Sequence, residues 1–459
     1  MKSSKYTTVI RNGGEYIIYN TLYDKLLICN QDIIDLLNKH SDFDSLKDIH
    51  PSLFKKLCDD KFIIPDDKDE VKELIDSIVQ QDDSDKSYRI TINPTMDCNL
   101  RCWYCYEKHL ANTNMSSEIL DRIKNLLLRI CSNHKTKYLT LSFFGGEPLL
   151  GFQNCVKPLI EYSIEICRKH DINLSLGFTT NAVLLDSKIV DFLSNTKLDV
   201  SMQIPFDGDR ATHNSIKKMR NGEGTYDIVL KNLNYAVSKG ISIVVRCNYT
   251  SKSASSFEKF TDDIMPLLQQ NKTKIRVSFH RVWQDIEDKR TGAIIDQLEE
   301  KVRSIGGNCY NHTLISGRCY ADKQNSFVIN YNGDIYQCTA REFSPENKEG
   351  YLCKDGTIEH NERYYKRMES RFSNPECMEC VMYPICAICT QKRLELNNSK
   401  CLLLMPEIDK FDKIRTRIKA IYELKTEYNL TDLREKTGIP FHILDDYIEE
   451  MMNGQKVVK

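Results

Sequence analysis

The sequence has no long apolar run, no apolar segment directly after Met1 and almost no net charge. A membrane-spanning helix needs ~20 consecutive apolar residues, so the sequence predicts neither a transmembrane helix nor a secretory signal segment. Lys and Arg balance Asp and Glu to a formal net charge of -1, which argues against nucleic acid and an acidic membrane surface as partners. We therefore expect a cytoplasmic protein.

Cysteine, by contrast, is abundant. The 459 residues include 18 cysteines, and the length exceeds that of one ordinary domain. In a reducing cytosol, metal ligation explains such a count better than disulfides do. Ten cysteines fall into two spaced sets, three of them in the run Cys98-Asn99-Leu100-Arg101-Cys102-Trp103-Tyr104-Cys105 and seven beyond residue 318. Most of the others are expected to pack as small apolar side chains.

The first set offers three thiolates with uneven spacing. A 4Fe-4S cube takes one thiolate at each iron, so Cys98, Cys102 and Cys105 would leave one iron free to bind a reacting molecule. A structural zinc site is the alternative, but zinc knuckles supply ligands in tight pairs and complete a closed set of four. The spacing therefore favours an iron–sulfur cluster with an open iron.

The spacing Cys-x3-Cys-x2-Cys, with the aromatic Tyr104 before the last cysteine, resembles the radical S-adenosylmethionine (radical SAM) family. The resemblance implies that the free iron binds the amino and carboxylate groups of SAM, and that reduction of the sulfonium releases a 5'-deoxyadenosyl radical. It assigns Cys98, Cys102 and Cys105 to the cluster and Tyr104 to the adenine. It also implies an external electron donor of the flavodoxin or ferredoxin type.

Two segments in which apolar and polar residues alternate place the cysteine loop at one end of a sheet. Residues 88–93 predict a strand that runs into the cysteine loop, and residues 138–144 predict a second strand that runs into Gly145-Gly146-Glu147-Pro148. Alone, such a segment marks only a turn. After a second strand it resembles the family segment whose backbone and Glu carboxylate bind the SAM amino group.

Strand and helix patterns then alternate, as they do in βα units around a parallel sheet. Further strands are predicted at residues 173–179, 199–205, 242–248 and 274–280, with a helix beginning after Ser116. Six such units predict an α/β fold, a partial (β/α)6 barrel of the TIM type. One face of each strand is polar, which favours a ligand site over a packed barrel interior.

Several polar residues on these strands match SAM-contact positions of the family. The resemblance assigns contacts with SAM to Thr179, Asn181, Ser201, Gln203 and Arg246. Arg246 would meet the SAM carboxylate, a role suited to a bidentate cation, and a surface salt bridge is the alternative.

The second set of cysteines resembles the SPASM extension of radical SAM enzymes that modify peptides, in which seven cysteines hold two auxiliary 4Fe-4S clusters. By the family pattern, one cluster takes Cys377, Cys380, Cys386 and Cys401. The other takes Cys319, Cys338 and Cys389, with Cys309 as the expected fourth ligand and Cys353 as a weaker candidate. Three clusters are thus implied in all.

One departure from the pattern concerns Cys389. Two residues separate Cys386 from Cys389 where the family usually has three, which leaves the role of Cys389 open. Paired Cys-x2-Cys segments are also typical of zinc ribbons, the alternative for this set.

The rest of the chain flanks these two cysteine sets. Residues 1–80 predict a β-hairpin over 16–29 and short helices, and they resemble the winged leader-binding modules (RRE) of peptide maturases; a domain that only shields the barrel is the alternative. An acidic stretch up to residue 87 predicts a solvated linker or helix. We predict a radical SAM barrel over 88–300, a SPASM domain over 301–405 and a helical appendage over 406–459.

Together these features predict a radical SAM peptide maturase. It would remove a hydrogen from a precursor peptide carrying a leader and install a thioether or carbon–carbon cross-link. An anaerobic sulfatase-maturating enzyme, which forms formylglycine, is the first alternative, and the 97 residues before Cys98 argue against it. A non-catalytic scaffold of the same fold is the second, and the retained cluster cysteines and Glu147 argue against that.

Overall fold

The computed structural model describes residues 1–12, 14–40, 43–286, 288–309, 318–396, 401, 414, 417 and 418. The chain divides into two compact units, which are described separately. The first unit is Met1–Asp83, Asn311–Lys323 and Lys366–Lys459, and the second is Ser84–Tyr310 and Gln324–Tyr365. The predicted helical appendage over 406–459 lies outside the described residues except at 414, 417 and 418. Within those residues, no helix has both the length and the apolar character needed to cross a membrane.

Six parallel strands form the centre of the second unit. They are β6 (Ser87–Ile92), β7 (Tyr138–Phe143), β8 (Asn173–Thr179), β9 (Asp199–Phe206), β10 (Ser242–Tyr249) and β11 (Ile275–Arg281), side by side in chain order. The helices between and after them are α5 (Ser117–Ser132), α6 (Lys157–Lys169), α7 (Ser187–Asn195), α8 (Arg210–Ile216), α9 (Tyr226–Ser238), α10 (Phe257–Gln270) and α11 (Lys289–Ser304). The predicted α/β class with a mostly parallel sheet is confirmed.

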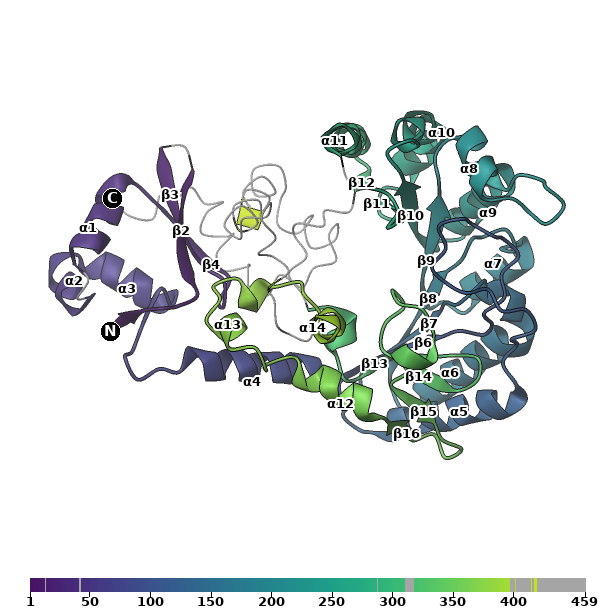
Figure 1. Ribbon diagram of the computed structural model, residues 1–459, viewed down its shortest axis with the longest axis horizontal. Helices are drawn as coiled ribbons and strands as arrows, with labels where there is room; N and C mark the ends of the chain where they lie inside the picture. Colours follow the sequence, from purple (N-terminus) through teal and green to yellow (C-terminus); the bar gives the residue numbers. More distant parts are fainter. Residues whose placement is uncertain are drawn as a thin grey trace. The chain divides into compact units, whose positions relative to one another are not determined.

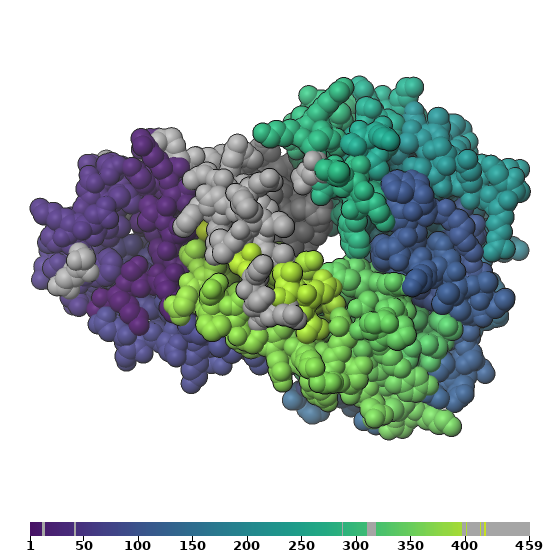
Figure 2. All heavy atoms as spheres, in the orientation of Figure 1, coloured from purple at the N-terminus to yellow at the C-terminus, as the bar shows by residue number. Residues whose placement is uncertain are grey.

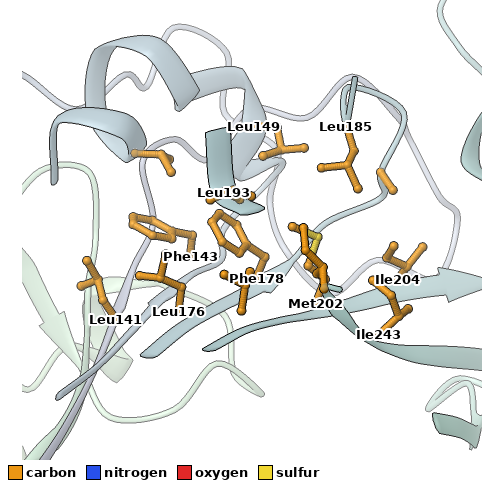
Figure 3. Close-up of a cluster of buried hydrophobic side chains, with 14 of the residues drawn as sticks. Leu141, Phe143, Leu149, Leu176, Phe178, Leu185, Leu193, Met202, Ile204 and Ile243 are labelled. Carbon is orange, nitrogen blue, oxygen red and sulfur yellow. The ribbon is translucent and has the colours of Figure 1, made fainter. Parts of the chain in front are cut away.

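The apolar core of this unit lies between the strands and the helices that flank them (Figure 1). Alternate strand residues point into it, as the period of two requires. Figure 3 shows Leu141, Phe143, Leu176, Phe178 and Met202 on the helix-facing side of their strands. The intervening residues point to the other side of the sheet. The strands therefore present their polar face away from the helices.

Short strands extend the parallel sheet at both ends. β12 (Asn308–Cys309) pairs with β11, and β13 (Ser326–Ile329) pairs in parallel with β6. β14 (Asp334–Tyr336), β15 (Gly350–Leu352) and β16 (Ile358–His360) follow in antiparallel order. β13 and β14 form a hairpin that turns at Asn332-Gly333, with Gly333 at φ +85°. Figure 2 shows the light green residues of this extension next to the blue residues of the first βα units.

The first unit begins with a three-stranded antiparallel sheet. β2 (Thr7–Asn12), β3 (Glu15–Asn20) and β4 (Lys25–Cys29) follow one another in space as in sequence. α1 (Gln31–Lys39), α2 (Phe43–Ile49) and α3 (Pro51–Asp59) come next, and β1 (Lys2–Ser3) pairs with β5 (Ile63–Ile64). The predicted hairpin is present as β3 and β4. β2 and α2 were not predicted.

The acidic stretch forms α4 (Glu70–Asp82), and one side of it is buried. Leu74 and Ile78 are buried, and Asp82 accepts a hydrogen bond from Arg318 Nε at 2.6 Å. The predicted helix is therefore present, but the expectation that it is solvated is wrong on this side, where the helix contacts apolar and ionic partners within its unit. The later helices are α12 (Glu362–Glu369), α13 (Pro375–Met378) and α14 (Thr390–Glu395).

Candidate functional site

The loop that carries the first three cysteines begins where β6 ends, at the carboxyl edge of the parallel sheet. The loop after β7 lies directly beside it. Gly146 N donates to Thr95 O at 3.1 Å, and Glu147 N donates to Asp97 O at 2.9 Å. These bonds continue the pairing of β6 with β7 beyond the strand ends. They fix Cys98, the next residue after Asp97, against the Gly-Gly-Glu segment.

The close approach of the two loops requires glycine. A Cβ atom at Gly146 would lie 2.1 Å from Asp97 O, and one at Gly145 would lie 2.5 Å from Thr95 O. Gly145 also has a φ of +100°, which L side chains rarely adopt. Both glycines are therefore required by the backbone contact that positions the cysteine loop.

We expect Gly146→Ala to weaken SAM binding at least tenfold, about 1.4 kcal/mol, because the added methyl group pushes the Asp97–Cys98 backbone away. Equilibrium binding of SAM to the anaerobically reconstituted protein measures the effect. Gly292→Ala is the matched control, because a Cβ atom at Gly292 meets nothing within 4 Å. If both variants bind SAM with equal affinity, the close approach of Gly146 to the Asp97 backbone is not needed for SAM binding.

The three thiols of the loop lie within electrostatic range of one another. Burial raises the pKa of Cys98 to about 12, and the negative charges of Glu147, Cys102 and Cys105 add to the increase. Burial likewise raises the pKa of Cys105 to about 11. Among the described residues, no three His, Cys, Asp or Glu side chains converge closely enough to hold a single metal ion. A 4Fe-4S cube instead spreads its thiolates over separate irons.

Asn181 and Glu147 join the ends of β7 and β8 to the cysteine loop. Asn181 Nδ2 donates to Asn99 Oδ1 at 2.7 Å and lies 3.7 Å from Cys98 Sγ. Glu147 is 0% exposed, and its carboxylate accepts hydrogen bonds from Thr180 Oγ1 and Asn181 N at 2.8 Å. Burial raises its pKa to about 7. Glu147 thus holds this edge together, and its contact with SAM stays a prediction.

The remaining predicted SAM contacts lie on neighbouring strands of the same unit. Thr179 is in register with Gln203, and Ser201 lies two residues earlier on β9, where it is exposed. Arg246 Nε donates to Asn248 Oδ1 at 2.9 Å. Burial lowers the pKa of the Arg246 guanidinium. No carboxylate in the described part of the chain lies within salt-bridge distance of it, so the alternative of a surface salt bridge is not supported there.

Tyr104 lies in a buried polar network that the sequence analysis did not predict. Its hydroxyl donates to Asp207 Oδ1 at 2.5 Å and accepts from Lys217 Nζ at 2.5 Å and from Asn248 Nδ2 at 3.1 Å. Asp207 directly follows β9, and that position at the carboxyl edge of the sheet was the available signal. Nothing in the spacing indicates Lys217. The network anchors the cysteine loop, at the residue directly before Cys105, to β9 and β10.

Three cysteines of the second set gather in the first unit. Burial is the largest cause of the raised pKa of the Cys386 thiol, and the negative charges of Cys377 and Cys380 also raise it. Arg393 Nη1 donates to Cys377 Sγ at 3.1 Å, and Arg393 Nη2 approaches Cys386 Sγ at 3.9 Å. The Arg393 guanidinium also packs on the Tyr383 ring, 5.0 Å from its centroid.

The other cysteines of this set are divided between the units. A hydrogen bond with Cys389 raises the pKa of Cys319, so these two thiols are in contact within the first unit. Cys338 belongs to the second unit, where Ala340 N donates to its sulfur at 3.2 Å. Cys309 lies in β12, in register with Val277 of β11. Cys401 is described outside any helix or strand, and its assignment as a ligand stays a prediction.

Comparison with known proteins identifies the family of the central segment. Residues 92–252 match the model of the radical SAM superfamily. This segment of the chain is a radical SAM domain. The family implies that it binds SAM and a 4Fe-4S cluster, which agrees with the three thiols at the edge of the sheet. The match begins at the last residue of β6 and ends shortly after β10, so it covers the cysteine loop, the Gly-Gly-Glu segment and Arg246.

Among curated relatives, the chain is 23% identical to a cysteine-type anaerobic sulfatase-maturating enzyme of Clostridium novyi, over 68% of this chain and 90% of that one. It is 24% identical to the radical SAM cyclopropyl synthase TigE of Paramaledivibacter caminithermalis, over 56% of each chain. The solved structure "Native anSMEcpe with bound AdoMet and Cp18Cys peptide" superposes with a TM-score of 0.52 and 17% identity, covering 80% of this chain and 99% of that one. The two curated relatives are similar to this chain in sequence, and the superposition shows that the solved structure shares its fold.

Proposed function

We propose that the protein is a radical SAM peptide maturase that removes a hydrogen from a precursor peptide and installs a thioether or carbon–carbon cross-link. The observation that carries the proposal is the small sheet module that precedes the barrel in the chain. Its strand β2 pairs only with β3 among the described residues, and Val9 on β2 is 49% exposed. An extended peptide adds readily to such an edge through its backbone.

Both faces of this sheet are already covered within the first unit, which leaves its edges for a ligand. Ile18 and Leu27 pack on the helix side, against Leu46 and Leu53. On the opposite side Ile10, Ile17, Tyr19 and Leu26 form a cluster that also contains Met382, Ile414 and Ile418. Backbone pairing at β2 or β4 is therefore the mode of recognition that we propose for the precursor.

The same packing decides how the module is tested. Tyr6 OH donates to Met378 O at 2.8 Å, and Thr21 Oγ1 donates to Val381 O at 2.5 Å, so deletion of residues 1–80 would expose the core of its own unit. Hydrogen–deuterium exchange avoids that disruption. A short precursor encoded beside the gene should slow amide exchange in β2 or β4. Unchanged exchange in both strands, with the precursor bound, would favour a shielding domain.

We assign the SAM site to residues at the carboxyl edge of the sheet. Cys98, Cys102 and Cys105 would hold the cluster, and the reduced cluster would supply a 5'-deoxyadenosyl radical from SAM. Arg246 would pair with the SAM carboxylate, because it is a half-buried cation with an amide as its hydrogen-bond partner. The backbone at Gly145, Gly146 and Pro148 and the side chains of Thr179, Asn181, Ser201 and Gln203 would complete the site, with Tyr104 near the adenine.

We expect Arg246→Gln to weaken SAM binding roughly tenfold to a hundredfold, since a hydrogen bond to a charged group contributes about 1.5–3 kcal/mol. Equilibrium dialysis with reconstituted protein measures the affinity. Arg129→Gln, which removes an exposed cation in the last turn of α5, should leave it unchanged. If both variants bind SAM as the parent protein does, Arg246 does not contact the carboxylate.

We further propose that Cys377, Cys380 and Cys386, with Cys401, hold an auxiliary cluster. Arg393 supports this assignment: it is 6% exposed, and no carboxylate of the described residues lies within salt-bridge distance of it. A buried cation needs an anionic partner, and two cysteine sulfurs are its nearest candidates. Cys319, Cys389 and Cys338, with Cys309, are proposed for the other auxiliary cluster.

A sulfatase-maturating activity is the second candidate function, because that curated relative is matched over 90% of its length. One experiment separates the two. The reconstituted protein is incubated with SAM, a reductant and either the precursor encoded beside the gene or a sulfatase-derived peptide with a reactive cysteine. Cross-linking removes two hydrogens from the precursor, whereas the sulfatase activity converts the cysteine to formylglycine. Mass spectrometry of both peptides decides; no reaction with the precursor would overturn the proposed function.

A further inference from the structure

A buried ion pair lies directly behind the cysteine loop. Lys217 Nζ is 2.5 Å from Asp207 Oδ2, and the side chains are 3% and 0% exposed. Tyr104 OH bridges the pair, because it accepts from Lys217 and donates to the second oxygen of Asp207. The Lys217 ammonium also lies 5.1 Å from the centroid of the Tyr104 ring. Both charges are thus removed from water and are held by a residue of the loop itself.

The pair is fixed in position by its own backbone surroundings. Asp207 follows β9, and Lys217 follows α8, where its backbone N donates to His213 O at 2.7 Å. Thr225 Oγ1 donates to Lys217 O at 2.9 Å. An ion pair held this rigidly keeps a constant orientation toward the loop. Stability alone does not explain it, because apolar residues of similar volume often replace a buried ion pair without loss.

The two charges act on Cys102 with opposite sign. Burial raises the pKa of the Cys102 thiol, whereas the Lys217 ammonium lowers it and the Asp207 carboxylate raises it. Tyr104, whose hydroxyl binds both charges, is two residues from Cys102 in the cysteine loop. A cluster held by this loop would therefore lie near both charges, and nearby charge is one of the factors that set the reduction potential of an iron–sulfur cluster.

We propose that Lys217 and Asp207 are positioning residues that set the reduction potential of the cluster bound by Cys98, Cys102 and Cys105. Reduction adds an electron to the cluster, and the Lys217 ammonium stabilises that negative charge, whereas the Asp207 carboxylate opposes it. Tyr104 holds the pair and the loop in one geometry. This inference rests on the cluster ligands proposed above.

The test is a potentiometric titration of full-length, reconstituted protein followed by EPR. The signal that changes when SAM is added identifies the cluster at the N-terminal cysteines. Lys217→Met should move its midpoint potential to a more negative value, and Asp207→Asn should move it to a more positive value. We expect the two variants to differ by at least tenfold in the ratio of reduced to oxidised cluster, about 59 mV for a one-electron couple.

Three further variants separate an electrostatic role from a structural one. Lys217→Arg keeps the charge and should restore the parent potential. The double variant K217M/D207N removes both charges and should lie between the two single variants. In the exposed pair of Lys239 with Asp191, whose atoms are 3.1 Å apart, Lys239→Met should leave the potential unchanged.

The outcomes distinguish this inference from the cluster assignment. Parent protein without a SAM-responsive signal would overturn the proposed cluster site itself. A SAM-responsive signal whose potential is the same in Lys217→Met, Asp207→Asn and the parent would overturn the inference while leaving the cluster in place. Shifts of the same sign in both single variants would also overturn it, since a loosened loop has no reason to follow the sign of the charge removed.

Discussion

Replacing Cys105 with alanine should abolish reductive cleavage of SAM while iron remains bound at the C-terminal cysteines. A three-thiolate loop has no spare ligand, so loss of one thiolate leaves two irons of the cube without a protein ligand. The parent protein should contain about twelve iron atoms per chain and the variant about eight, if each cluster is a four-iron cube. Formation of 5'-deoxyadenosine, measured by chromatography after addition of dithionite, is the direct readout.

Cys155→Ala is the matched control for this variant. Cys155 is also a buried thiol of the second unit, but its sulfur donates to Met115 Sδ at 3.5 Å and it belongs to neither spaced set. This control should retain the iron and the formation of 5'-deoxyadenosine. If Cys105→Ala still forms 5'-deoxyadenosine at the parent rate, the cluster assignment is wrong. Stoichiometric zinc in place of iron at the C-terminal cysteines would instead support the zinc alternative.

The parallel strands could be predicted from the sequence because their two faces differ in polarity. β8 has the predicted bounds, and β7 differs from the prediction by one residue at its end. Both alternate buried and half-buried residues, so the period of two is visible in the sequence. β13 is different: its four residues are all buried, so the period of two is not visible in it and only the Asn332-Gly333 turn that follows indicates a strand.

A related limit applies to residues 324–365, which lie within the predicted SPASM segment 301–405. Cysteine spacing indicates ligands, but it carries no information about which sheet the intervening strands join. In the structure β13 pairs with β6 and extends the parallel sheet, whereas residues 366–396 belong to the first unit. The predicted segment 301–405 thus contributes to both units.

At the candidate site, residues within a recognisable segment could be predicted and their long-range partners could not. The Gly-Gly-Glu segment follows a strand directly, so its place at the sheet edge followed from the sequence. Lys217 reaches Tyr104 from 113 positions away in the sequence. Arg393 reaches Cys377 across 16 positions. Such contacts depend on the tertiary structure, and no local period indicates them.

The second large effect concerns the auxiliary cluster proposed at Cys377, Cys380 and Cys386. Cys386→Ala should remove about four iron atoms per chain and abolish the cross-linked product, while 5'-deoxyadenosine still forms. The reason is that SAM cleavage needs only the N-terminal loop, whereas we propose that the electron left over when the carbon radical forms the cross-link passes to an auxiliary cluster. Iron analysis and mass spectrometry of the precursor measure the two effects separately.

Arg393→Met and Arg393→Lys serve as companion variants, because they alter the surroundings of the sulfurs without removing a ligand. Arg393 donates to two of the three sulfurs, so loss of its charge should make this cluster harder to reduce, and lysine should restore part of the effect. Cys386→Ala and Cys105→Ala are then distinguished by 5'-deoxyadenosine. Cys386→Ala should form 5'-deoxyadenosine without the cross-linked product, and Cys105→Ala should form neither. If Cys386→Ala retained both its iron and the cross-linked product, the cysteines of this set would have a structural role only, and the leftover electron would need another acceptor.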